Sequence, residues 1–121
     1  MCFWIFKRDA FKKDAKKYVQ EKFNFLIEKG YEYSYFFCNC ETSFGFLKNN
    51  ININVYYDVY PTEEVVDLVI YKGKDYNNGK NIRDIISFDE NYFKNLSSKQ
   101  KIDFFAELIK SNLEKIENTF A

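Results

Sequence analysis

The stretch Ile51–Tyr60, with the sequence ININVYYDVY, decides the fold of this chain. One row of alternate positions holds Ile51, Ile53, Val55, Tyr57 and Val59, and the other holds Asn52, Asn54, Tyr56, Asp58 and Tyr60. Successive side chains of a β-strand point to opposite faces of its sheet. The alternation therefore predicts a strand whose apolar row faces a core and whose polar row faces water.

Further strands are expected on both sides of this one. Residues 31–40 place Tyr31, Tyr33, Tyr35 and Phe37 on one face, and Glu32, Ser34, Phe36, Cys38 and Cys40 on the other. Residues 43–48 predict a short strand that ends at the turn Lys48-Asn49-Asn50. After Pro61, residues 65–72 are apolar on both faces apart from Asp67, which is typical of an interior strand. Gly73–Asn81 predicts a polar loop.

Helical patterns precede and follow these strands. Residues 8–29 predict one helix that ends at Gly30, with its buried stripe at Phe11, Ala15, Tyr18, Val19, Lys22, Phe25 and Leu26. Residues 82–96 predict one or two short helical turns. The last helix is expected to begin at Ser97, which stands at capping-box spacing from Gln100. Its buried stripe is Ile102, Phe105, Ala106, Ile109, Leu113, Ile116 and Phe120.

This order of elements predicts an α+β fold in a single domain over residues 1–121. Short connections favour an antiparallel meander of about four strands. The N-terminal helix and the C-terminal helices are then expected to pack on one face of that sheet. A chain of 121 residues is of a suitable size for one such domain.

Charge is balanced overall but unevenly distributed. The chain has 18 basic and 18 acidic residues, and residues 30–71 hold one basic group against six acidic ones, a net of −5. Nucleic-acid binders are usually basic, so we expect no nucleic-acid partner. We also expect no membrane partner, because no segment approaches the roughly 20 apolar residues of a span. Met1–Phe6 lacks the features of an export signal, and we expect a cytoplasmic protein with free thiols.

The residue inventory removes most catalytic chemistry. The chain has no histidine, which excludes the Ser-His-Asp and Cys-His arrangements and the histidine-dependent metal sites. It also lacks a phosphate-binding glycine loop. The Cα atoms of Cys38 and Cys40 would lie roughly 6.5–7 Å apart on a strand, at the limit of disulfide geometry. Even with Cys2 the chain has only three thiols, so a zinc site would need a fourth ligand. We therefore expect no catalytic residue, metal or cofactor, and no enzyme activity.

Acidic residues gather around the turn between the third and fourth strands. Three interpretations of them are solvated turn residues, a Mg²⁺ or Ca²⁺ site, and a surface for a basic partner. The (D/E)-x-K pattern of restriction-type nucleases fails, because Lys72 follows Ile70-Tyr71. Tyrosine beside acid on a rigid sheet suits a basic protein partner. The candidate partner-binding residues are Tyr56, Asp58, Tyr60, Glu63, Glu64 and Asp67.

The layout resembles that of small bacterial immunity proteins, the inhibitors of contact-dependent and other polymorphic toxins. The features that carry the resemblance are the leading amphipathic helix, the tyrosine-rich segments Tyr31–Cys40 and Ile51–Tyr60, the polar segment Gly73–Lys80 and the trailing helix. It covers most of the chain at the level of layout and composition, and it transfers no motif residue. It implies a cytoplasmic protein that binds and blocks one toxin, often a basic nuclease, without catalysis.

A second hypothesis is a small-ligand-binding or regulatory domain. The chain has 14 Phe and 10 Tyr residues around one expected core. Such a surplus could line a pocket for an apolar or aromatic ligand between the sheet and the helices. A deep pocket there would favour this hypothesis, and a solid core would count against it.

Overall fold

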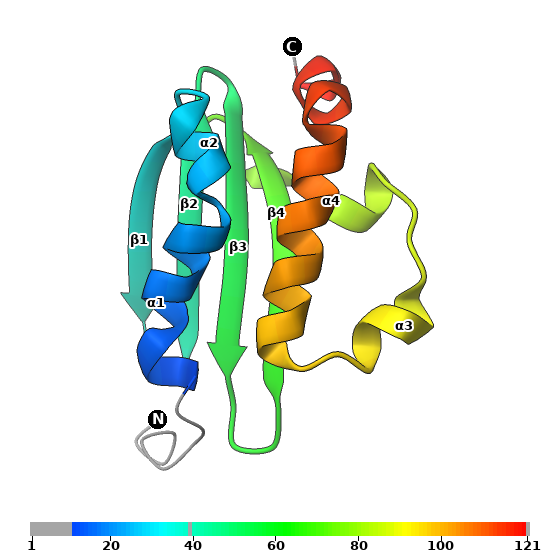
Figure 1. Ribbon diagram of the computed structural model, residues 1–121. Coiled ribbons are helices and arrows are strands. Elements are labelled where there is room, and N and C mark those ends of the chain that lie inside the picture. The colour runs from blue at the N-terminus through cyan, green and yellow to red at the C-terminus, as the bar shows by residue number, and fades with distance from the viewer. Residues whose placement is uncertain (1–10, 39, 121) are drawn as a thin grey trace.

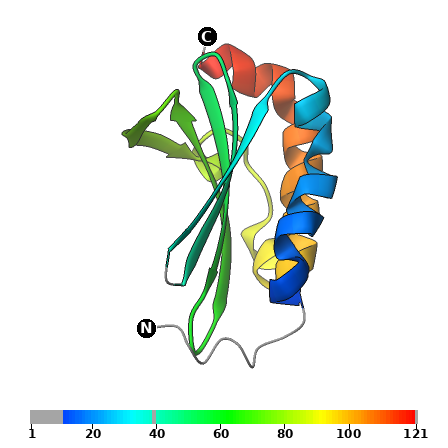
Figure 2. The ribbon, with the colours of Figure 1, turned by 90° about the vertical axis from the view of Figure 1, so that its left-hand side faces the viewer.

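The computed structural model describes residues 11–38 and 40–120, and it has the α+β architecture that the sequence predicts. Five antiparallel strands form one sheet in the order β1-β2-β3-β4-β5. Helices before and after the strands pack on one face of this sheet (Figure 1). The other face, which we call the open face, carries no helix of the described chain, as the view from the side shows (Figure 2).

The strands form a meander with one more member than expected. Their bounds are β1 Glu32–Cys38, β2 Glu41–Lys48, β3 Ile51–Val59, β4 Glu64–Lys72 and β5 Asp75–Asn81. The expectation of a loop over Gly73–Asn81 is wrong, because β5 pairs with β4 along the second edge of the sheet. This strand has no apolar alternation because it buries almost no side chain, and its contacts with the sheet are made by its backbone, Gly79 and the polar or aromatic side chains of Tyr76 and Asn81. Hydrophobic periodicity could not reveal it.

The helical segments are α1 Phe11–Lys22, α2 Asn24–Glu28, the 3₁₀ turn η2 Ile82–Asp84, α3 Glu90–Lys94 and α4 Ser98–Thr119. The single helix expected over residues 8–29 is broken at Phe23, and residues 8–10 lie outside the described residues. Phe23 is fully buried and stacks on Phe46 of β2, with 5.6 Å between the ring centroids. The capping box at Ser97 and Gln100 forms as predicted.

The core lies between the helices and the sheet. The predicted apolar row of β3 is buried throughout, and so is the predicted stripe of α4. Part of the phenylalanine surplus forms a ring cluster between α3 and α4, made of Phe88, Phe93, Phe104 and Phe105. These rings therefore serve packing in the core rather than an enclosed ligand site.

The open face of β3 differs from the expected solvated row. Asn52 and Asn54 are each only 3% exposed, although no described helix covers them. The Asn54 Nδ2 donates to Asn52 Oδ1 at 2.8 Å, and Ser43 Oγ donates to Asn54 Oδ1 at 3.1 Å. The Asn52 Nδ2 donates to the carbonyl oxygen of Gly73 at 2.9 Å. We call Ser43, Asn52 and Asn54 the polar ladder, and its hydrogen bonds allow the two asparagine side chains to be buried.

Gly45 makes room for this polar ladder on the neighbouring strand. A Cβ atom at this position would lie 2.7 Å from Ser34 Oγ and 3.2 Å from Asn54 Oδ1. Both distances are shorter than ordinary van der Waals contact, so a side chain here would press on the ladder. The glycine in the middle of β2 is thus explained by packing on the open face.

Cys38 and Cys40 lie at the connection between β1 and β2. Cys38 is exposed at the end of β1. Cys40 is disulfide-bonded, which differs from the free thiol expected for it. Cys2 lies outside the described residues.

Candidate protein-binding surface

Strand register places charged side chains of a single sign on the open face of strands β1 to β4. The charged side chains that β1 to β4 place on this face are Glu32, Glu41, Asp58 and Asp67, all of them acidic. Glu41 pairs directly with Asp58, and Tyr56 pairs directly with Asp67. Like charges on neighbouring strands repel one another, so this end of the open face attracts positive charge.

Asp58 lies at the centre of this arrangement and is half-buried. The pKa of its carboxyl is raised from 3.8 to about 6, with burial as the largest cause; the Thr42 backbone N–H opposes the rise, and the negative charges of Glu41 and Asp67 contribute to it. That N–H lies 3.4 Å from Asp58 Oδ1. A cation brought to this carboxylate by a partner would relieve the repulsion from both neighbouring acids.

Tyrosines border the acids on the same face. The Tyr60 hydroxyl is hydrogen-bonded to Glu41, and desolvation together with the charge of Asp58 raises its pKa. The Tyr56 hydroxyl lies 2.7 Å from that of Tyr71, and burial is the main cause of its raised pKa. Both phenols therefore remain protonated at neutral pH. They are half-buried rather than fully solvated, which is less exposed than the sequence pattern indicates.

Of the other three candidate residues, one is exposed in the turn beside this surface and two make contacts within the molecule. Glu63 is exposed in the β3–β4 turn. The Glu64 carboxylate is on the helix side, where it accepts hydrogen bonds from the hydroxyls of Tyr57 at 2.9 Å and Ser98 at 2.6 Å. Asp67 forms a 2.7 Å salt bridge with Arg83. Glu64 and Asp67 thus hold the fold together, which leaves them less available to a partner.

Phe36 and Glu41 join the surface, although the sequence analysis does not select them. Phe36 is 62% exposed, and its register places it across Ser43 from Tyr56. The alternation of residues 31–40 puts Phe36 on the face of its strand opposite Tyr33 and Tyr35. That signal cannot say which strands are neighbours, and only the register brings Glu41 beside Asp58 and aligns Phe36 with Tyr56 across Ser43. We define the acidic surface as Phe36, Glu41, Tyr56, Asp58, Tyr60 and Glu63.

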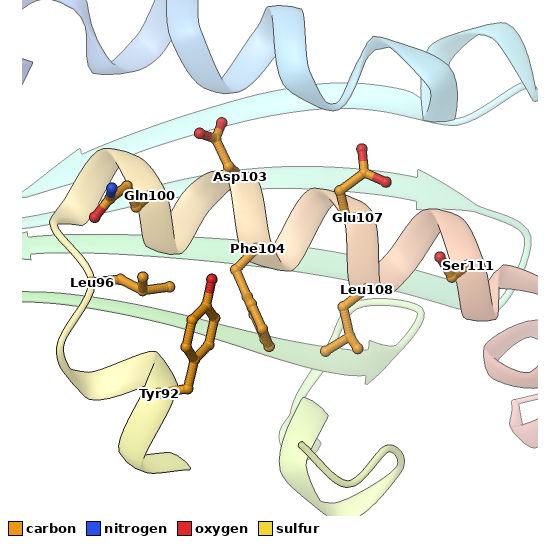
Figure 3. Close-up of a pocket in the computed structure, with 8 residues that line it drawn as sticks. All are labelled: Tyr92, Leu96, Gln100, Asp103, Phe104, Glu107, Leu108 and Ser111. Carbon is orange, nitrogen blue, oxygen red and sulfur yellow. The ribbon is translucent and has the colours of Figure 1, made fainter. Parts of the chain in front are cut away.

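A groove lies on the helix side of the molecule, between α4 and the segment that contains α3 (Figure 3). It has a volume of about 510 Å³. Its lining consists of Tyr92, Leu96, Gln100, Asp103, Phe104, Glu107, Leu108 and Ser111. In Figure 3 the side chains of Phe104 and Leu108 project from the side of α4 that faces the segment containing α3. Those of Asp103 and Glu107 project from the opposite side of α4.

A smaller cavity of about 180 Å³ lies between α1 and the ends of β1, β2 and β3. Its lining includes the aromatic side chains of Tyr35, Phe37, Phe44 and Tyr57. Pockets for drug-sized ligands measure roughly 300–1,000 Å³, so this cavity has room only for a smaller molecule. It occupies the position at which the ligand-binding hypothesis expects a pocket.

Two further observations concern metals and membranes. Among the described residues, no group of three or more Cys, Asp or Glu side chains is arranged to hold a metal ion. Over the same residues, no helix combines the length and the apolar character needed to cross a bilayer.

Comparison of the chain with protein-family models, with curated proteins and with solved structures finds no match.

Proposed function

We propose that this chain is a non-enzymatic protein-binding module, an immunity protein that binds and neutralises a cognate bacterial toxin in the cytoplasm. The observation that carries the proposal is the acidic character of strands β1 to β4 on the open face, which remains after Arg83 has neutralised Asp67. Every charged side chain that β1 to β4 present there is acidic. Such a surface favours a basic protein partner, because complementary charge steers encounter and suppresses wrong partners.

The aromatic side chains of the acidic surface supply contact area for this partner. Phe36 is a large exposed apolar side chain, and Tyr56 and Tyr60 add rings whose hydroxyls can still accept hydrogen bonds. Aromatic side chains on a rigid sheet bury area at little cost in conformational entropy. A lysine or arginine of the partner could lie over such a ring and reach Asp58 or Glu41.

Neutralisation follows from the charge of the target. A nuclease toxin contacts the phosphates of its substrate with basic side chains. An acidic protein surface bound to those side chains would exclude the substrate without any catalytic step. This mechanism needs no histidine, metal or phosphate loop, in agreement with the composition of the chain.

The test begins with the toxin domain encoded beside this gene. That domain should arrest growth when it is expressed alone, and co-expression of this chain should restore growth. The paired variant Glu41→Lys, Glu63→Lys reverses charge at two exposed positions of the acidic surface. We expect it to weaken binding by about tenfold or more, because both changes repel a basic partner, and to lose protection.

The matched control is Glu28→Lys, Glu114→Lys, which makes the same change of net charge at two exposed positions on the helices. It should bind and protect like the wild-type chain, as measured by calorimetry and growth. Equal losses in the two paired variants would show that only net charge matters. A neighbouring domain that neither inhibits growth nor binds this chain would overturn the proposal.

The cavity of about 180 Å³ supports a second candidate function, the binding of a small apolar or aromatic ligand. Native mass spectrometry of the purified chain would detect a retained ligand. Titration with indole or phenol should shift the resonances of the cavity side chains if the site accepts aromatic molecules. Absence of both signals would exclude this function.

A further inference from the structure

The groove along α4 is separate from the acidic surface, and its floor is apolar. Phe104, Leu96 and Leu108 are half-buried, and Tyr92 is 58% exposed. Phe104 packs on the core rings of Phe88 and Phe93, so the floor is held rigid from below. Exposed apolar area of this kind, beside polar side chains, is typical of an interaction site.

The charge along the groove has one sign. Asp103 and Glu107 are the charged residues of its lining, and both are acidic. Asp103 contacts Lys22 and accepts a hydrogen bond from the Tyr18 hydroxyl. Glu107 is exposed and forms no salt bridge within the described part of the chain. Glu107 is therefore the carboxylate that can receive a cation from an occupant.

The lysines of α4 do not neutralise the groove. The ammonium group of Lys99 lies 5.0 Å from the ring centroid of Tyr18, and that of Lys110 lies 6.0 Å from that of Phe25. The ammonium group of Lys101 lies 5.3 Å from the ring centroid of Phe93. None of these three lysines belongs to the lining, and neither does Lys115, the fourth lysine of α4.

The geometry of the lining favours a helical occupant. Gln100, Phe104 and Leu108 follow one another at intervals of four residues, and the lining extends to Ser111, over about 16 Å of helix. Rows of side chains at this spacing pack against the ridges of another helix. The lining comes from helices and the connection between them, with no strand edge to pair with an extended peptide. A helix satisfies its own backbone hydrogen bonds and needs none from the groove.

From these observations we infer that the α4 groove binds an amphipathic helix of a partner, with apolar side chains on Phe104, Leu108 and Tyr92 and a Lys or Arg beside Glu107. This interaction goes beyond the proposed toxin contact, because it uses a different side of the molecule. It is the helix-in-groove mode of recognition. The groove and the acidic surface can therefore be tested independently.

The experiment titrates the isotope-labelled full chain with a synthetic peptide of about 14 residues, enough to span the groove. The peptide contains equal numbers of leucine and lysine, with the leucines at helical spacing. A second peptide of the same composition alternates the two residues and favours an extended form. We expect the helical peptide to shift the amide resonances of residues 92–111 in a saturable way. The alternating peptide should bind there about tenfold more weakly.

Glu107→Lys should weaken the helical peptide's binding to the groove by about tenfold at low salt. The control Glu114→Lys makes the same change of charge at an exposed position of α4 outside the groove, and it should stay within about twofold of the wild-type chain. Equal effects of these variants would overturn the inference, and so would shifts confined to the acidic surface. Equal binding of the two peptides at the groove would overturn the helical mode. The variant Glu41→Lys, Glu63→Lys, which changes the acidic surface, should bind the helical peptide at the groove as the wild-type chain does.

Discussion

At the residue scale, the environment of Asp58 makes stability depend on pH. The pKa of its carboxyl is about 6 in the folded protein, above its ordinary value of 3.8, chiefly because the group is desolvated. The folded chain thus holds this proton more tightly than the unfolded chain does. The corresponding stabilisation is fully present below about pH 4 and is lost as pH rises through 6.

We therefore predict that Asp58→Asn raises the free energy of unfolding at about pH 7.5 and has little effect at about pH 4. The gain at the higher pH should be about 1 kcal/mol, a value reduced for solvent screening at a half-buried site. Urea unfolding at both pH values measures it. Glu63→Gln, at an exposed position, is the control and should change little at either. An equal gain at both pH values would contradict this prediction.

The polar ladder is the second feature at this scale. Asn54→Ala would leave the Asn52 Oδ1 atom without its 2.8 Å hydrogen bond at a site that is 3% exposed. We expect the free energy of unfolding to fall by about 2 kcal/mol, the cost of an unsatisfied buried polar group together with a small cavity. Asn50→Ala, in the exposed turn, should cost less than about 0.5 kcal/mol in the same denaturant measurement.

At the element scale, β5 depends on a glycine. Gly79 lies opposite Tyr71 of β4, and a Cβ atom there would be 2.5 Å from Tyr71 Cε1 and 2.8 Å from Val69 Cγ1. The Tyr71 ring thus covers the glycine of the edge strand, a pairing that protects edge glycines in sheets. This contact supports the register of β5 together with the Tyr71–Tyr76 ring contact and the hydrogen bonds from Asn81 to Asp67.

Gly79→Ala should therefore displace the Tyr71 ring or separate β5 from the sheet. We predict faster hydrogen exchange at the β5 amides and a loss of about 1–2 kcal/mol in the free energy of unfolding. Asn77→Ala, at an exposed position of the same strand, serves as the matched control. Unchanged exchange in Gly79→Ala would show that the register does not depend on this contact.

The N-terminus of α4 offers a second prediction at this scale. The Ser97 hydroxyl accepts from the Gln100 backbone N–H at 3.2 Å, and the Gln100 side chain accepts from the Ser97 backbone N–H at 2.9 Å. Ser97→Ala should cost about 1 kcal/mol in thermal or urea unfolding, because the Gln100 backbone N–H in the first turn loses its acceptor. Ser111→Ala, exposed on the same helix, should be neutral or slightly stabilising.

At the scale of the whole molecule, the acidic surface predicts how partner binding depends on pH and salt. A basic partner favours the charged form of Asp58, so affinity should rise from about pH 5 to 7.5 as this carboxyl ionises. The association rate should fall as ionic strength increases, because exposed charges are screened. Calorimetry and surface plasmon resonance with the toxin domain measure these effects. Asp58→Asn should flatten the pH dependence, and a steeper dependence in this variant would contradict the assignment.

Much of this fold is predictable from local patterns. The alternation in β3, the stripe of α4 and the capping box at Ser97 each reflect a repeat that lies within one element. The break at Phe23 and the strand β5 are not predictable in this way. Phe23 leaves the helical path to stack on Phe46 of a distant strand, and β5 is held by the backbone of β4 and the ring of Tyr71.

The candidate surface, too, is predictable from the sequence only in part. The acidic character of residues 30–71 and the Tyr56, Asp58 and Tyr60 row follow from the sequence, because a strand's period of two is a local property. The roles of Glu64 and Asp67 do not, since their partners Ser98 and Arg83 lie far away in the chain. Proximity between such residues is a result of strand register and packing, and no local pattern encodes it.

The sequence by itself thus determined the α+β class, the direction in which β3 faces the core, and the absence of histidine-based chemistry. Only the tertiary structure decided which side chains stand together, because the pairing of β1, β2 and β3 brings Glu41 beside Asp58 and aligns Phe36 with Tyr56. It also decided that Asn52 and Asn54 are buried, because neighbouring strands supply the hydrogen bonds that replace water. The α4 groove likewise exists only where α3 and α4 pack together.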